Sequence, residues 1–214
     1  MTRLAALLLV IPLTSEANWQ VLKYRAIPPH EVRFEANGLR IDVNASAAPI
    51  VHRLDQVVRV RRLWARGSVD GDLRTTAARQ GQRGADDYFV RVGLVEVGKR
   101  TPTWLERRMA PAWARRLFDL APPGSGIGGI RFFNVGVAAE QIGRSRRHPA
   151  SDLIHEEVVA IPEESGSFVV DVHLERPIPT AAVWISADGD DTQSRFRLTL
   201  ERLELTLDGP PGAP

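Results

Sequence analysis

From residue 18 onward the chain consists largely of short runs in which apolar and polar residues alternate, separated by turn-forming residues. Alternation with a period of two places successive side chains on opposite faces of a strand, so each run predicts a strand with one buried face. Such runs occupy residues 19–24, 32–35, 39–43, 57–64, 88–97, 130–137, 168–174, 181–186 and 195–207. About nine to eleven strands without interleaved helices predict an all-β fold, an antiparallel β-sandwich of the jelly-roll kind.

Local signals refine this pattern at three places. The sequence Ala36-Asn37-Gly38 lies between two alternating runs and predicts a hairpin. The alternation of the last run changes phase near Arg202, which indicates a β-bulge. Residues 66–84 are polar and rich in glycine, so we expect a loop there.

Residues 103–118 depart from the strand pattern and predict one short helical excursion. Thr103 and Glu106 have the spacing of a capping box, and Pro111 is expected to divide or kink the helix. Apolar residues recur every four positions, at Leu105, Met109, Trp113 and Leu117. We expect this stripe to pack onto the core. Contact with anionic lipid or glycan is the alternative, because arginines surround the stripe.

Residues 1–17 have the layout of a secretory signal peptide. Arg3 provides the positive charge, residues 4–13 are apolar, and Ser15 and Ala17 occupy the −3 and −1 positions of a cleavage site. We therefore predict a mature protein that begins at Asn18 and is periplasmic or secreted. The apolar run, about ten residues, is too short to span a bilayer, and no transmembrane segment is expected in the mature protein. The alternative is a short strand or helix of the core.

Composition narrows the class of protein further. The 214 residues include no cysteine, which excludes disulfides and a lipid-anchored cysteine. The 28 basic and 26 acidic residues nearly cancel to a net charge of +2, so we expect no nucleic-acid partner. The length suits one domain, predicted at residues 18–207 and followed by a flexible tail at 208–214.

A series of short motifs gives the chain a resemblance to a known family. A strand bearing Trp64 and an acidic loop at 70–76 precede the sequence Gly-Ala-Asp-Asp-Tyr-Phe-Val-Arg-Val at 84–92, and an Asp-rich turn follows the apolar strand near residue 186. In this order the motifs resemble an uncharacterised family of exported bacterial proteins, domain of unknown function three-zero-four-seven. The family has Gly-Asp-Asp where this chain has Gly-Ala-Asp-Asp, and this chain carries an insertion around residues 79–83. The resemblance implies a jelly-roll sandwich, a fold that often binds carbohydrate, and implies no particular activity.

Acidic turns are the first candidate site. Asp86 and Asp87 lie at the start of the strongest predicted strand, and Asp188, Asp190 and Asp191 crowd one turn. Closely spaced carboxylates suit Ca²⁺, which takes oxygen ligands. The second trio is therefore a candidate for one structural calcium ion, and no other cofactor is expected. Asp and Gly are also ordinary turn formers, which is the simpler explanation.

The segment 148–157 is the second candidate site, because two histidines, one aspartate and two glutamates fall within ten residues. His155 and Glu157 are its candidate binding residues, as ligands for Zn²⁺ or as an acid and a base. On a strand, His155 and Glu156 point to opposite faces, which argues against joint ligation. Trp104, beside two arginines, is the tryptophan we expect at the surface, where it would stack on a sugar.

These features favour an exported, non-catalytic protein that binds a glycan or another component of the cell envelope. The alternative is a carboxylate-dependent hydrolase acting on saccharide or envelope material, and a structural subunit of an envelope assembly is a third reading. Whether the chain is an enzyme stays open at this stage. A compact pocket that unites Asp86, Asp87, His155 and Glu157 would favour the enzyme, whereas exposed tryptophan and arginine side chains in an open groove would favour binding.

Overall fold

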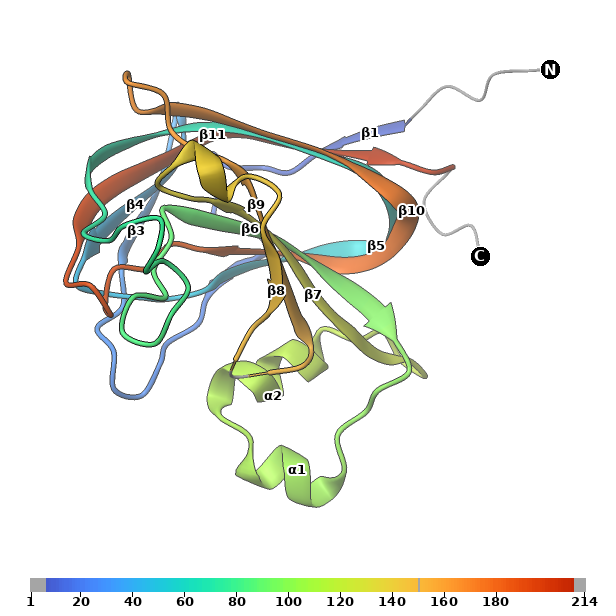
Figure 1. The fold of residues 1–214 in the computed structure, drawn as a ribbon. Coiled ribbons are helices and arrows are strands. Elements are labelled where there is room, and N and C mark those ends of the chain that lie inside the picture. Colours follow the sequence, from blue (N-terminus) through green and yellow to red (C-terminus); the bar gives the residue numbers. More distant parts are fainter. Residues whose placement is uncertain (1–6, 150, 210–214) are drawn as a thin grey trace.

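The structure, a computed structural model, describes residues 7–149 and 151–209. Within these ranges eleven strands join in one sheet that curves into a β-sandwich, with only short helices (Figure 1). The all-β, jelly-roll-like fold predicted from the alternation is therefore confirmed. The strands are β1 (Leu7–Val10), β2 (Trp19–Val21), β3 (Glu31–Glu35), β4 (Gly38–Asn44), β5 (Ile50–Asp72), β6 (Val90–Gly98), β7 (Gly126–Val135), β8 (Ser145–Arg147), β9 (Ile154–Ala160), β10 (Ser167–Ser186) and β11 (Arg195–Leu207).

The main path through the sheet runs β3-β4-β11-β5-β10-β6-β7-β9-β8, with β1 beside β11 and β2 beside β5. Pairing is antiparallel except between β7 and β9, which run parallel. The long strands β5 and β10 shift register against each other between His173 and Ile178 and between Thr180 and Ala182. Because such irregularities bend a strand, the sheet curves over itself and encloses its main core.

The bulge predicted near Arg202 is present, since β11 shifts register against β5 between Leu200 and Arg202. The loop predicted at residues 66–84 begins later than expected, because β5 continues to Asp72. The glycine content of this segment led to the wrong start for the predicted loop. A Cβ on Gly67 would lie 2.4 Å from the carbonyl oxygen of Thr199, so this glycine permits a close approach of two strands.

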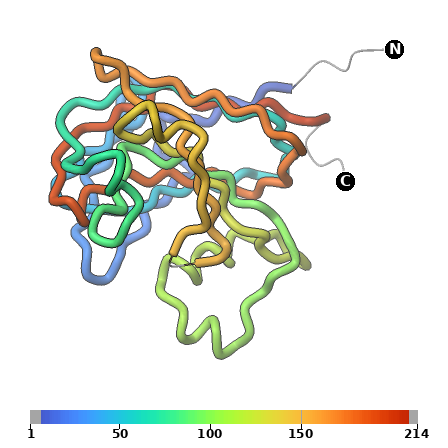
Figure 2. The backbone as a smooth tube through the Cα atoms, viewed as in Figure 1, coloured from blue at the N-terminus to red at the C-terminus, as the bar shows by residue number. Residues whose placement is uncertain are grey.

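The helical excursion divides at Pro111 into α1 (Trp104–Met109) and α2 (Ala112–Asp119), and the capping box of Thr103 and Glu106 is formed. Leu117 of α2 is buried in the core as predicted, but the expectation is wrong for α1. Leu105 and Met109 are 60% and 77% exposed, because α1 lies apart from the strands at one end of the molecule (Figures 1 and 2). A short 3-10 helix, η1 (Ala139–Gln141), follows β7.

The N-terminal apolar segment is part of the fold. Strand β1 pairs with β11, and Ile11, which is 2% exposed, and Leu13 enter the main core. The Trp19 indole Nε1 donates a hydrogen bond to the carbonyl oxygen of Pro12 at 2.7 Å. Residues 1–6 of the predicted signal peptide lie outside the described residues, and its cleavage stays a prediction. The pairing of β1 with β11 does not test that prediction, and Leu7, Leu8 and Val10 of β1 are exposed.

At the other end of the chain, Asp208 is held by β5. Its backbone N–H donates to the carbonyl oxygen of Arg59 at 2.8 Å, and its carboxylate pairs with Arg61. The rest of the predicted tail, residues 210–214, lies outside the described residues. No helix among the described residues is long and apolar enough to cross a membrane.

A second, smaller core lies on the outer face of the sheet. It joins Val95 of β6, Ile130 of β7 and Trp184 of β10 to Leu117 of α2, and Trp113 packs at its margin. The helix α2 thus covers only part of this face. The uncovered part of the same face carries the candidate site.

Candidate functional site

One cross-strand row sets the floor of the site. Trp184 of β10 and Phe132 of β7 both pair with Gly93 of β6, Phe132 pairs with Glu156 of β9, and Glu156 pairs with Arg146 of β8. Paired residues in a sheet share a face, so these side chains lie together on the outer face. A Cβ on Gly93 would lie 2.7 Å from the ring of Phe132, so the glycine leaves the space that this ring occupies.

A buried arginine organises the polar end of the row. Arg91 of β6 donates from Nε to Glu156 Oε1 at 3.0 Å and from Nη2 to Asp86 Oδ1 at 3.1 Å, and it also pairs with Asp188. Its guanidinium lies 4.6 Å from the centre of the Tyr88 ring. Burial lowers the pKa of Arg91, but the carboxylates of Glu156 and Asp86 outweigh burial and raise it. The arginine is therefore a permanent cation beneath the site.

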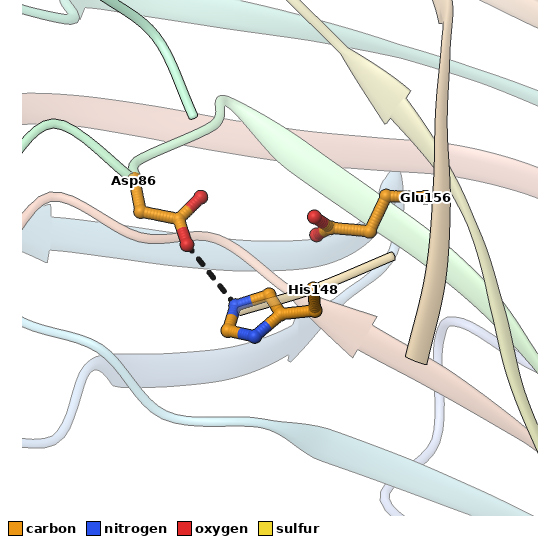
Figure 3. A group of neighbouring side chains, drawn as sticks. All are labelled: Asp86, His148 and Glu156. Atoms are coloured by element: carbon orange, nitrogen blue, oxygen red, sulfur yellow. Dashed lines mark ion pairs between the residues drawn. The ribbon is translucent and has the colours of Figure 1, made fainter. Parts of the chain in front are cut away.

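Arg146 and His148 complete the network at its exposed side. Arg146 donates from Nε to Glu156 Oε2 at 2.7 Å and pairs with Asp86. His148 Nε2 lies 3.0 Å from Asp86 Oδ2, the contact drawn in Figure 3. Burial raises the pKa of Asp86, but the hydrogen bond of His148 and the charges of the two arginines hold it below its ordinary value.

Asp86, His148 and Glu156 bring three ligand atoms within 4.8 Å of one another, the spacing that a metal site needs. Two arginine guanidiniums, however, already bond both carboxylates. A divalent cation would have to displace or sit against these charges, so the donor set suits an internal ion-pair network better than a metal ion.

The network opens onto a pocket of about 210 Å³ between α2 and the outer face of the sheet. Its apolar walls include the rings of Tyr24, Trp113, Phe132 and Trp184. Its polar side is formed by Arg91, His148, Glu156 and Ser186. Burial raises the pKa of Tyr24 to about 12, so this phenol keeps its proton and can donate a hydrogen bond. The pocket thus combines aromatic faces with fixed hydrogen-bonding groups.

The candidate residues chosen from the sequence do not gather in one place. Asp86 belongs to the network, but the Asp87 carboxylate accepts hydrogen bonds from the backbone of Thr192, at 2.7 Å, and from its hydroxyl. Burial raises the pKa of Asp87. His155 and Glu157 point to the face of β9 opposite to Glu156, as the strand alternation requires. The convergence that would have favoured an enzyme is absent from these four residues.

Trp104 is 72% exposed on α1, where the Arg108 guanidinium lies 5.5 Å from the centre of its ring. The surface position predicted for this tryptophan is confirmed. It does not line the pocket beside α2. Its proposed role in stacking on a sugar therefore has no support from the pocket geometry.

The three carboxylates suggested for calcium face different partners. Asp188 pairs with Arg91 and accepts a hydrogen bond from the Ser186 hydroxyl at 2.9 Å, whereas Asp191 accepts one from the backbone of Asp86 at 3.0 Å. Burial, followed by the charge of Asp87, raises the pKa of Asp190 to about 6. Because an arginine already neutralises Asp188, the trio does not fit a calcium site as a set.

Sequence reasoning missed Arg91, Arg146, Trp113 and Trp184 as site residues. One signal was available. Arg91 stands between Val90 and Val92 in the apolar first half of its strand, and a charged residue in such a setting predicts a buried, paired group. Nothing in the sequence alone places Arg146 opposite Glu156, because that contact depends on the pairing of β8 with β9.

The fold and the site define the class: a curved β-sandwich with a partly aromatic pocket on the outer face of one layer. No family model matches the chain and no curated protein matches it, so the family suggested by the short motifs stays a prediction.

The chain is also similar to solved structures at low sequence identity. The xylan-binding module CBM15 aligns over 95% of this chain and 97% of its own, with a TM-score of 0.39 and 7% identity. The VIP36 exoplasmic/lumenal domain in a Ca²⁺/Man2-bound form aligns over 97% and 90%, with a TM-score of 0.41 and 9% identity. The enzymatically active domain of the bacteriophage CBA120 tailspike protein 4 aligns over 91% of this chain and 20% of its own, with a TM-score of 0.38 and 6% identity. At these values the similarities carry no argument about function.

Proposed function

We propose that the chain is an exported β-sandwich protein that binds a glycan, without cleaving it, in the pocket beside α2. The observation that carries this proposal is the union of aromatic rings with buried polar groups in one concave site. Trp113 offers a partly exposed apolar face above the buried ring of Trp184, while Arg91 and Glu156 present charged groups fixed by their mutual hydrogen bond. Small-molecule sites typically have this composition, with apolar walls and a few placed polar groups.

Sugars suit such a surface because they combine apolar C–H faces with hydroxyls. An aromatic ring provides a large apolar contact, and Tyr and Trp add a polar edge. The pocket volume of about 210 Å³ is small, which favours one or two sugar units in direct contact over a long enclosed chain. Tyr24 and Ser186 line the pocket as well, and the Ser186 hydroxyl already donates to Asp188.

The ion pairs argue against cleavage. A glycosidase needs a carboxyl group that carries a proton near neutral pH, together with a second carboxylate. Both oxygens of Glu156 accept hydrogen bonds from arginines, and the pKa of Asp86 lies below its ordinary value. Both oxygens of Glu156 are therefore already engaged as acceptors, and Asp86 is held as a carboxylate.

A matched pair of tryptophan variants tests the proposal. The protein is screened against an array of neutral oligosaccharides, and affinities for the ligands found are measured by tryptophan fluorescence and calorimetry. Trp113→Ala is expected to weaken binding about tenfold or more through loss of a stacking face, whereas Trp104→Ala, on the neighbouring helix, leaves affinity unchanged.

Two results would contradict the proposal. One is a failure of every oligosaccharide to bind the folded protein, and the other is an equal affinity of Trp113→Ala and the parent protein. Release of reducing ends from a bound oligosaccharide, lost in Glu156→Gln, would establish the hydrolase alternative instead. Circular dichroism of each variant checks that the fold is retained.

A further inference from the structure

A second site lies on the other face of β7, β8 and β9. The strand register places Arg131 of β7 and Arg147 of β8 on either side of His155 of β9, each as its direct cross-strand partner. All three side chains are exposed and share one face. The two arginines are separated by two strand spacings, about 10 Å, a distance that their long side chains can close around a small group.

The two arginines of this row have no ion-pair partner among the described residues, although Glu157 lines the same depression. In the part of the chain that the structure describes, neither Arg131 nor Arg147 forms an ion pair with a carboxylate. Some exposed arginines elsewhere on the sheet are paired, as Arg62 is with Asp171 and Arg66 with Glu201, and, within the described ranges, others such as Arg53 are not. Because two cations lie on one face of neighbouring strands, an anion placed between Arg131 and Arg147 would be attracted to both of them.

The row also borders a cavity. A depression of about 380 Å³ is lined by Arg131, Arg147 and His155, together with Ser145 and Glu157. Phe132 and Glu156 line both this depression and the pocket beside α2, so the sheet itself is the wall between the two sites. The Glu156 carboxylate is bonded to Arg91 and Arg146, which leaves Glu157 as the only uncommitted carboxylate among the described lining residues.

We infer that the row Arg131–His155–Arg147 binds an oxyanion, such as a carboxylate, sulfate or phosphate group carried by a ligand. Guanidinium groups bond such oxygens in a planar, two-point manner, and these charge-assisted hydrogen bonds are stronger than neutral ones. Ser145 adds a hydroxyl donor at the edge of the depression. The site is separate from the proposed glycan pocket, and its occupation does not depend on that proposal.

Nuclear magnetic resonance on ¹⁵N-labelled protein tests the inference with simple salts. Sodium sulfate, acetate and phosphate are titrated separately at constant ionic strength, with sodium chloride as reference. Saturable shifts at the amides of residues 131, 147 and 155 are expected with at least one of the three oxyanions and not with chloride. The ion that binds tightest identifies the chemistry of the group.

Variants are expected to change the oxyanion affinity in opposite directions. Replacing both arginines, Arg131→Gln with Arg147→Gln, is expected to weaken the oxyanion about tenfold or more. Glu157→Gln removes the opposing charge and is expected to strengthen it severalfold. Arg53→Gln, an exposed arginine on β5 outside the depression, serves as the matched control and leaves the affinity unchanged.

The inference is overturned by equal shifts in chloride and in all three oxyanion salts. It is also overturned by saturable shifts that persist in the double arginine variant with unchanged affinity. Spectra of each variant without added salt verify the fold. Because the variants lie outside the pocket beside α2, loss of oxyanion binding with intact glycan binding, or the reverse, separates the two proposals.

Discussion

Arg91 and Glu156 bond to each other over an intervening strand. Arg91 belongs to β6 and Glu156 to β9, with β7 between them, yet Nε and Oε1 lie 3.0 Å apart and both side chains are buried. The pair therefore ties together three strands at the edge of the outer face. It also fixes the polar side of the pocket beside α2.

Loss of this arginine is expected to destabilise the protein strongly. Arg91→Met leaves the buried carboxylates of Glu156 and Asp188 without their common cation, and removal of one member of a buried pair typically costs about 3–5 kcal/mol. Urea unfolding measures the loss. Arg66→Met, which breaks the exposed pair with Glu201, is the control and should cost less than about 1 kcal/mol. Similar losses for both variants would contradict the buried network.

The N-terminal strand gives a second prediction. Ile11→Ala is expected to lower the free energy of unfolding by about 2–4 kcal/mol, because Ile11 is 2% exposed in the main core. Leu8→Ala, on the same segment but 53% exposed, should change it by less than about 0.5 kcal/mol. Both are measured on protein whose N-terminus has been sequenced. If residues 1–17 are removed on export, neither substitution remains in the mature protein, and sequencing will show it.

The strands could be predicted because alternation reports burial directly. The shift of phase near Arg202 even located a bulge, and the spacing of Thr103 and Glu106 located a helix start. The wrong predictions arose where a residue type has two uses. Gly67 marks close strand contact rather than a turn, and Leu105 is apolar yet lies on a helix that does not reach the core.

The site was less predictable than the fold, because its members meet only through tertiary pairing. Asp86 was chosen as part of an acidic turn and the segment containing His148 for its density of titratable groups, and the structure brings these two together. His155 was chosen instead of Glu156. Its side chain points to the face of β9 opposite to the cluster of Asp86, His148 and Glu156. Trp113 was assigned to a core stripe, and only the position of α2 over the sheet makes it a pocket wall.

Trp184 and Trp104 differ strongly in exposure, so substitutions at these two positions test their burial through the free energy of unfolding. Trp184 is buried on the outer face of β10, so Trp184→Ala is expected to cost about 3–5 kcal/mol of unfolding free energy. Trp104→Ala removes a side chain that is 72% exposed and should cost less than about 0.5 kcal/mol. Fluorescence adds a check, since Trp104 should account for most of the emission quenched by iodide. A large loss of stability in Trp104→Ala would mean that α1 packs against the protein.

The pH dependence of Asp190 gives the last prediction. Its pKa rises from 3.8 in the unfolded chain to about 6 in the fold, because of burial and the charge of Asp87. Between these values the folded state binds more protons than the unfolded state, so this group's contribution to stability is lost as the pH rises from about 4 to 6. Asp190→Asn removes this loss. The variant should be more stable than the parent by about 1–2 kcal/mol at pH 7, given the partial exposure of the group, and equal to it near pH 3.5.

Urea unfolding of both proteins from pH 3.5 to 7.5 checks this expectation. The same measurement with added calcium tests whether the turn binds a cation. Because Arg91 already neutralises Asp188, millimolar calcium should not raise the unfolding midpoint of the parent protein. A rise with calcium that is absent in Asp190→Asn would instead assign a cation site to the turn and reverse our reading of it. Parent and variant of equal stability at pH 7 would show that the Asp190 carboxylate is as well solvated in the fold as in the unfolded chain.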